Sequence, residues 1–236
     1  MGPTASGKTR VAVALGQRLE VELVNADSRQ AIAELAVGVC KPTASELCGV
    51  ACHGLDWSHL GQPFSAAEYC ELATTCVAQI AERGRAALLV GGTGLYIRSL
   101  LAGFDFGGVP PEAHRSRQGE RDAESERGAA AALLGEHPEW PWRVDRNNPR
   151  RVIRAAELSR AGSVAARRTP PWSVTKLALR VSAEVLRARI EARSERLVGE
   201  PLRREVELLL SLGFPAEVLA RSAIGYAETL AWLQGG

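Results

Sequence analysis

The residues directly after the initiator Met form a complete phosphate-binding loop. Residues 2–9 read GPTASGKT, which places two glycines, a lysine and a hydroxyl at the spacing G-x-x-x-x-G-K-T. In this pattern backbone N–H groups surround a phosphate, the lysine adds a point charge and the hydroxyl can reach Mg²⁺. An amphipathic run begins at Lys8, so a helix N-terminus would face the anion. We therefore expect a site for a di- or triphosphate, with a chance glycine turn as the alternative.

A strand normally leads into such a loop, but only Met1 precedes Gly2 in this sequence. Two explanations stay open: the start is truncated, or the sheet lacks a central strand.

The composition favours a globular protein of the cytoplasm. A chain of 236 residues with 46% hydrophobic content can bury one substantial core, with room for a smaller appended unit. No apolar run approaches the ~20 residues that span a bilayer, so we expect no membrane partner. Five cysteines without paired spacing suit reduced thiols, and we expect a monomer. Cys48, Cys52 and His53 could be metal ligands, but no second ligand pair stands at zinc-finger spacing.

Charge is distributed unevenly along the chain. The net charge is only +2, yet the window 143–168 holds eight arginines against Asp145 and Glu157. The planar guanidinium suits phosphate and base contacts, so this basic segment indicates a polyanionic partner such as nucleic acid. The alternative is a general preference for arginine over lysine, which explains the residue type but not the local excess.

Two apolar stretches end in polar turns and predict neighbouring strands. Residues 21–25 precede Asp27, and residues 86–90 precede Gly91-Gly92-Thr93. Between them Ser65 and Glu68 form a capping box that starts a helix. The carboxyl ends of parallel strands share one edge of a sheet, where ligands bind. The predicted fold is therefore α/β, a parallel P-loop NTPase-like sheet flanked by helices.

The character of the sequence changes after residue 107. We expect an α/β core over residues 1–107 and 166–236, interrupted by a mainly helical insertion over residues 108–165. Asn148 and Pro149 are a good helix start. In the helix that follows, Arg150, Arg151 and Arg154 can share one face while Val152, Ile153 and Ala156 pack inward. Residues 177–181 are predicted to return to the sheet as a strand, followed by helices over residues 183–212 and from residue 215 onward.

A phosphate loop alone favours a nucleotide kinase or a nucleoside triphosphatase. Such enzymes usually hold Mg²⁺ with an acidic residue at the end of a second apolar strand. The strand over residues 86–90 ends in Gly-Gly-Thr instead, and Asp27 is the nearest acid to the loop. Asp27 could merely cap a turn. Its position also suits a general base beside a phosphate-bearing substrate.

An ordered series of motifs resembles the tRNA dimethylallyltransferases and spans nearly the whole chain. The matching segments are GPTASGKT (2–9), NADSRQ (25–30), Gly38 with Lys41-Pro42, His53, Leu55-Asp56, PFSAAE (63–68), VGGTGLYIRSLLAGF (90–104), NNPRRVIRAAE (147–157) and Ile224-Gly225-Tyr226. The resemblance implies transfer of dimethylallyl from dimethylallyl diphosphate to the exocyclic N6 amine of the adenine 3′ of the tRNA anticodon. The phosphate loop would then hold a leaving diphosphate.

The resemblance also implies roles for individual residues. Asp27 matches the catalytic aspartate and Thr93 the site residue of the Gly-Gly-Thr turn, although a helix cap is the simpler role for Thr93. Thr9 would reach Mg²⁺. The expected diphosphate ligands are Gly2, Pro3, Thr4, Ala5, Ser6, Gly7, Lys8, Thr9 and Arg193, the last of which could also be an ordinary surface arginine. The expected tRNA contacts are Asp27, Ser28, Arg29, Gln30, Arg150, Arg151 and Arg154.

Two rival functions remain at this stage. An adenylate dimethylallyltransferase would use the same loop on a free nucleotide, but such a substrate needs no extended basic face. An RNA-binding protein without activity would keep the fold and the basic segment.

Overall fold

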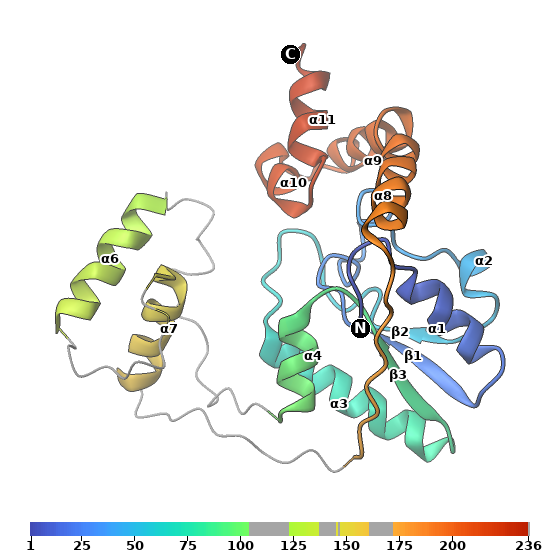
Figure 1. Cartoon of the computed structure of the whole chain (residues 1–236). Coiled ribbons are helices and arrows are strands. Elements are labelled where there is room, and N and C mark those ends of the chain that lie inside the picture. The colour runs from blue at the N-terminus through green and yellow to red at the C-terminus, as the bar shows by residue number, and fades with distance from the viewer. Residues whose placement is uncertain (104–122, 137–144, 146, 161–171, 236) are drawn as a thin grey trace. The chain divides into compact units, whose positions relative to one another are not determined.

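The computed structural model describes residues 1–103, 123–136, 145, 147–160 and 172–235 (Figure 1). The chain separates into two compact units, Met1–Leu101 with Pro171–Gly236, and Ala102–Pro170. The domain limits expected from the sequence, at residues 108 and 165, stay a prediction.

The first unit contains α1 (Lys8–Gly16), β1 (Val21–Asn25), α2 (Ala44–Leu47), β2 (Cys52–His53), α3 (Ala66–Glu82), β3 (Ala86–Val90), α4 (Gly94–Leu101), α8 (Ala183–Leu197), α9 (Glu200–Ser211), α10 (Ala216–Ser222) and α11 (Tyr226–Leu233). The second contains α6 (Ala123–Glu136) and α7 (Pro149–Arg160).

The described sheet is parallel and has the strand order β2-β1-β3. In the register of β1 and β3, Leu23 pairs with Leu88 and Asn25 pairs with Val90. The two predicted strands are thus confirmed as neighbours, and their carboxyl ends lie at the same edge. β2 was not predicted because two residues are too few to show a periodic pattern.

Side chains of β1 alternate between two cores, as the pleat of a strand requires. Leu23 packs with Ala12 and Val13 of α1, whereas Val24 packs with Tyr69 and other residues of α3 on the opposite face. Helices therefore cover both faces of the sheet. This is the predicted α/β architecture.

The start of α3 follows the predicted capping box. Ser65 accepts a hydrogen bond from the Glu68 amide at 3.1 Å, and Glu68 accepts one from the Ser65 amide at 2.7 Å. The helix then places Tyr69 in the core, where its hydroxyl donates to the Asn25 carbonyl at 3.0 Å. A local sequence signal thus anchors α3 to the end of β1.

The prediction of a strand over residues 177–181 is wrong. The segment from Trp172 to Val181 contains no strand and runs as an extended trace (Figure 1). Its hydrogen bonds at Leu177 and Leu179 go to Met1. A segment forms a β-strand only where another strand lies beside it and shares backbone hydrogen bonds. Here a cavity lies between this segment and β3, so the segment does not pair with β3.

A second core joins the C-terminal helices to the loop after β1. Leu35 and Val39 of that loop are buried with Val206 of α9, Leu219 of α10 and Tyr226 of α11. The Glu205 carboxylate lies beneath the loop and accepts from the amides of residues 36–38 at 2.7–2.9 Å. α9 and α11 therefore hold the segment that follows the candidate site residues.

The sequence predicted a mainly helical insertion, and both described elements of the second unit are helices. α7 begins at Pro149, as predicted from Asn148-Pro149. Val152 and Ala156 are buried on its inner face and pack against Leu133 and Leu134 of α6. The pair forms a small core of its own.

Candidate active site

The phosphate loop has the left-handed turns of an anion cradle. Ala5 has φ 60° and Gly7 has φ 88° immediately before α1. A left-handed residue next to right-handed ones turns successive N–H groups toward one concave side. The amides of Gly7, Lys8 and Thr9 have no acceptor within the described residues, and the buried Ser6 hydroxyl likewise has no partner there. Together they provide donors for phosphate oxygens at a helix N-terminus.

Lys8 bends back over its own loop. Its ammonium donates to the carbonyls of Gly2 at 3.0 Å and Pro3 at 2.8 Å. Burial lowers the pKa of Lys8, the carboxylate of Asp27 opposes this shift, and Arg193 adds to it. Residues from three separate segments thus act on one ammonium group, so the predicted site residues Asp27 and Arg193 lie near the phosphate loop.

One face of α8 brings arginines to this loop. Arg189 Nη1 lies 3.5 Å from the Ala5 carbonyl oxygen and 3.4 Å from that of Ser6. Arg193 follows one turn later and, besides Lys8, acts on the half-buried thiol of Cys40, where it opposes the rise in pKa that burial causes. Sequence reasoning selected Arg193 but missed Arg189. The sequence did hold a signal for Arg189: it stands four residues before Arg193 on the same helix, so both side chains share one face.

Asp27 is held rigidly at the end of β1. Its amide donates to Asn25 Oδ1 at 3.1 Å, and Asn25 Nδ2 donates to the carbonyls of Asp27 at 3.1 Å and Gly54 at 2.9 Å. The Oδ1 atom of Asp27 accepts hydrogen bonds from the amides of Arg29 at 3.0 Å and Gln30 at 3.4 Å. The simpler prediction of a turn cap is therefore correct for one oxygen. The other, Oδ2, would lie 2.9 Å from a Cβ added to Gly92, so it faces the turn after β3.

Thr93 links the carboxyl ends of β1 and β3 through hydrogen bonds. Its amide donates to the Ala26 carbonyl at 2.9 Å. Its hydroxyl accepts from the Ser28 amide at 2.8 Å and donates to Ser28 Oγ at 3.1 Å. A Cβ added to Gly91 would lie 2.1 Å from the Ala26 carbonyl carbon, so only glycine permits this approach. The Gly-Gly-Thr sequence thus positions Ser28 and Asp27 relative to β3.

The remaining residues of the predicted tRNA set in this loop differ in their contacts. Gln30 Nε2 donates to the carbonyls of Val39 at 3.2 Å and Cys40 at 2.8 Å, which closes the loop on itself. Arg29 is exposed. In this structure the Gln30 amide group supports the loop, whereas the Arg29 side chain is available to a partner.

The predicted arginines of α7 belong to the second unit, and their surroundings differ. The Arg151 side chain is 62% exposed and lies 3.3 Å from Asp145 Oδ2. Arg154 bonds the buried Glu157 carboxylate at 2.8 Å and is mostly covered. The side chain of Arg150 lies outside the described residues, as do Arg143, Arg146, Arg167 and Arg168 of the basic segment. Of the described pair, Arg151 is the one that presents its guanidinium to solvent.

The residues of the phosphate loop could hold Mg²⁺ only if the substrate supplied most of the oxygen ligands. In the described part of the chain no three His, Cys, Asp or Glu side chains gather into a metal cluster. Thr9 is half-buried in the first turn of α1 and provides one hydroxyl oxygen. Mg²⁺ in phosphate sites commonly takes one or two protein oxygens together with phosphate oxygens and water. Thr9 suits that arrangement.

A parallel sheet with a phosphate loop and a carboxylate at its carboxyl edge defines a P-loop α/β protein. The turn after β3 carries no carboxylate, so the arrangement lacks the second acidic position of the usual nucleoside triphosphatases.

Comparisons with known proteins identify the family. The sequence profile of the IPP transferase family matches residues 30–236. The chain is 39% identical over 242 residues to a tRNA dimethylallyltransferase of Anaeromyxobacter dehalogenans, covering 99% of this chain and 81% of that protein. It is 36% identical to a tRNA dimethylallyltransferase of Chloroflexus aurantiacus, covering 100% and 82%. The chain belongs to the IPP transferase family.

Solved structures agree with this assignment. The structure is similar to the crystal structure of the tRNA isopentenylpyrophosphate transferase of Bacillus halodurans, with a TM-score of 0.66 and 33% identity over 99% of this chain and 76% of that one. A eukaryotic dimethylallyltransferase crystallised acting on tRNA has the same fold, with a TM-score of 0.74 at 19% identity over 99% and 62% of the two chains.

A search of the described helices finds none with the length and hydropathy needed to cross a bilayer.

Proposed function

We propose that this protein transfers a dimethylallyl group from dimethylallyl diphosphate to the N6 amine of the adenine 3′ of the anticodon in tRNA. The observation that carries the proposal is the placement of a lone carboxylate, Asp27, close enough to the phosphate loop to act on Lys8. No second carboxylate follows β3 in the described residues. This arrangement suits a reaction in which the loop holds a leaving group and the carboxylate takes a proton.

The residues of the loop bind and stabilise the departing diphosphate. Negative charge develops on its oxygens as the allylic C–O bond breaks, and prearranged N–H donors and cations lower the energy of that charge. Lys8, Arg189, Arg193 and the amides of residues 7–9 are placed to do so. Mg²⁺, held by Thr9 and phosphate oxygens, would supply Lewis-acid stabilisation of the same charge.

Asp27 acts as the general base for the amine. As the new C–N bond forms between the allylic carbon and N6, one N6 proton passes to Asp27 Oδ2, the oxygen that does not cap the turn. A base placed in this way contributes roughly 10²–10⁴-fold to the rate. Thr93 lies beside this position through its bonds to Ser28.

The second unit supplies the surface for the tRNA. Arg150, Arg151 and Arg154 lie in the first half of α7, and Arg151 is exposed. A base within a tRNA loop reaches a catalytic pocket only when it is extruded from its stack. Arg29 and the loop of Ser28 and Gln30 would receive that base.

The variant Asp27→Asn tests the proposal sharply. The asparagine oxygen keeps the bonds to the Arg29 and Gln30 amides, while the basic oxygen is replaced by an NH₂ group. We expect transfer of radiolabelled dimethylallyl to unmodified tRNA to fall by roughly 10²–10⁴-fold, with tRNA affinity and melting temperature unchanged. Glu71→Gln, on the exposed side of α3, is the matched control and should keep full activity.

Other outcomes would favour other functions. Labelling of AMP in preference to tRNA would indicate an adenylate dimethylallyltransferase. Consumption of ATP would indicate a kinase. Salt-dependent tRNA binding by the wild type without any transfer would indicate a binding protein.

A further inference from the structure

Two of the three tyrosine hydroxyls of the chain have a hydrogen-bond partner, and the third does not. Tyr69 donates to the Asn25 carbonyl at 3.0 Å, and Tyr226 donates to Glu205 Oε2 at 2.6 Å. Tyr96 is only 4% exposed, yet within the part of the chain that the structure describes its hydroxyl has no partner. A buried phenol hydroxyl usually has one. The open hydroxyl of Tyr96 therefore points to a ligand that completes its bonding.

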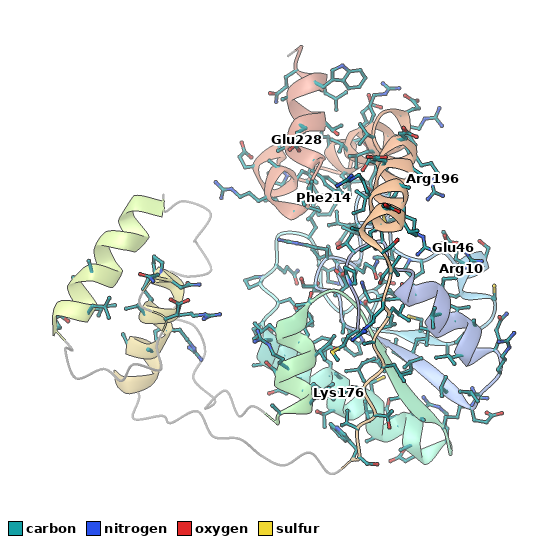
Figure 2. All side chains as sticks on the ribbon, viewed as in Figure 1. Arg10, Glu46, Lys176, Arg196, Phe214 and Glu228 are labelled. Atoms are coloured by element: carbon teal, nitrogen blue, oxygen red, sulfur yellow. The ribbon has the colours of Figure 1, made fainter. Side chains whose placement is uncertain are left out.

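The Tyr96 ring is held rigidly beside the candidate active site. It lies in the first turn of α4, which follows β3 and so begins at the carboxyl edge of the sheet. The ring stacks on that of Tyr69, with centroids 4.0 Å apart and planes 10° apart, and Phe64 meets it edge-on at 6.2 Å. Side chains of α3 and α4 pack together in this core (Figure 2). Tyr69 bonds the Asn25 carbonyl, and the Asn25 side chain holds the Asp27 amide, so the stack is fixed relative to Asp27.

The hydroxyl end of Tyr96 lies on the side of the site that faces the acceptor. Burial raises the pKa of the phenol to about 12, and the charges of Glu68, Arg29 and Asp27 also act on it. Glu68 stands in the first turn of α3, and Asp27 and Arg29 follow the end of β1. These groups belong to the carboxyl edge of the sheet. With so high a pKa the phenol keeps its proton at neutral pH and is available as a hydrogen-bond donor.

We propose that the Tyr96 hydroxyl donates a hydrogen bond to a ring nitrogen of the extruded acceptor adenine, either N1 or N7. These two acceptors flank the N6 amine, N1 on the Watson–Crick edge and N7 on the Hoogsteen edge, and extruded bases are recognised on these edges. A donor there fixes the rotation of the base in its own plane. The amine is then presented to Asp27 Oδ2, and such orientation raises the rate of the chemical step. This inference rests on the proposed function.

The variant Tyr96→Phe removes the hydroxyl and keeps the stacked ring. Because that hydroxyl bonds nothing in the described residues, the melting temperature should change by less than ~2 °C. We expect kcat/KM for tRNA to fall about 3–10-fold, the value of one neutral hydrogen bond, with the KM for dimethylallyl diphosphate unchanged. Tyr69→Phe is the matched comparison, since it removes the same atom from the other stacked ring. It breaks the bond to the Asn25 carbonyl and should lower the melting temperature.

Modified tRNA identifies the atom that Tyr96 contacts. In three substrates the acceptor adenine is replaced by its 1-deaza, 7-deaza or 3-deaza analogue, in which C–H takes the place of one ring nitrogen. Each analogue also changes the reactivity of the amine, but that effect appears in both enzymes and cancels when they are compared. The loss caused by either the 1-deaza or the 7-deaza analogue should be about 3–10-fold smaller in Tyr96→Phe than in the wild type. The 3-deaza analogue should cause the same loss in both.

Several results would overturn this role of Tyr96. Equal losses in the wild type and in Tyr96→Phe for all three analogues would show that the hydroxyl does not contact the base. A higher KM for dimethylallyl diphosphate, with the tRNA parameters unchanged, would assign the hydroxyl to the other substrate. A fall in melting temperature of more than ~5 °C would assign it to the fold.

The same assay separates this inference from the function on which it rests. If the wild type transfers nothing to unmodified tRNA, the proposed function is wrong and the role of Tyr96 falls with it. If transfer occurs without coupling between Tyr96 and a ring nitrogen, only the role of Tyr96 is wrong.

Discussion

The Glu205 carboxylate offers a quantitative test of how the C-terminal helices support the site. It is 8% exposed and receives four hydrogen bonds, from the amides of Ala36, Val37 and Gly38 and from the Tyr226 hydroxyl at 2.6 Å. Two carboxylate oxygens can accept four such bonds, whereas a glutamine offers one oxygen and an NH₂ group. In Glu205→Gln the NH₂ group would face the Gly38 amide and the Tyr226 hydroxyl.

The expected loss follows from these contacts. The phenol can rotate to accept from the new NH₂ group, but the Gly38 amide cannot, so one buried donor stays unsatisfied at about 1–3 kcal/mol. The two bonds kept by the oxygen lose the assistance of the charge, worth about 1 kcal/mol each. We expect Glu205→Gln to lower the free energy of unfolding by about 3–5 kcal/mol.

Tyr226→Phe is the graded comparison. It removes one donor and leaves the carboxylate with three amides, so we expect a loss of about 1.5–3 kcal/mol. Burial, with the nearby carboxylate, raises the pKa of Tyr226, so the phenol stays a donor throughout the ordinary pH range. Guanidinium unfolding of both variants, with the slope m unchanged, measures the two losses. A smaller loss for Glu205→Gln than for Tyr226→Phe would refute the reasoning that the carboxylate organises the loop.

Three further predictions concern the sheet and the loop. Gly91→Ala should destabilise the protein by at least ~2 kcal/mol in thermal unfolding, since its Cβ would lie 2.1 Å from the Ala26 carbonyl carbon and the backbone would have to shift. Arg189→Ala should raise the KM for dimethylallyl diphosphate by ~10-fold with an unchanged melting temperature, and an unchanged KM would remove Arg189 from the diphosphate site. The Arg83 guanidinium, and after it His53, holds the pKa of Glu22 at about 2 instead of 4.5. The ion pair between Glu22 and Arg83 therefore stabilises the fold fully above pH 4.5 and progressively less as the pH falls toward 2. Glu22→Gln should therefore lose less stability than the wild type between pH 5 and pH 3 in urea unfolding, and parallel pH curves would contradict the assignment.

Local signals account for the elements that the sequence revealed. The Ser65 and Glu68 capping box and the Asn148-Pro149 start mark helix ends with bonds made inside a few residues, and the runs over residues 21–25 and 86–90 are apolar because both faces of those strands are covered. The family motifs likewise pointed to Asp27 and Thr93 at a common edge.

Features that depend on distant partners were not predictable in the same way. Glu205 resembles any helix glutamate until residues 36–38 meet it across 167–169 positions of sequence. Gly38 is needed because a Cβ there would lie 2.4 Å from Tyr226 Cε2, which explains why a glycine and a tyrosine so far apart both belong to the matched motifs. The strand expected over residues 177–181 is apolar enough to pair, but pattern alone does not show whether a neighbour is present.

The hydroxyl of Thr93 has only one hydrogen, and the structure gives that hydrogen to Ser28 Oγ. A hydroxyl oxygen has two lone pairs, and the Ser28 amide uses one of them. What remains to Thr93 is therefore a single acceptor and no donor. While it keeps this bond, the hydroxyl could accept an N–H from an incoming substrate but would have no hydrogen to give to a phosphate oxygen.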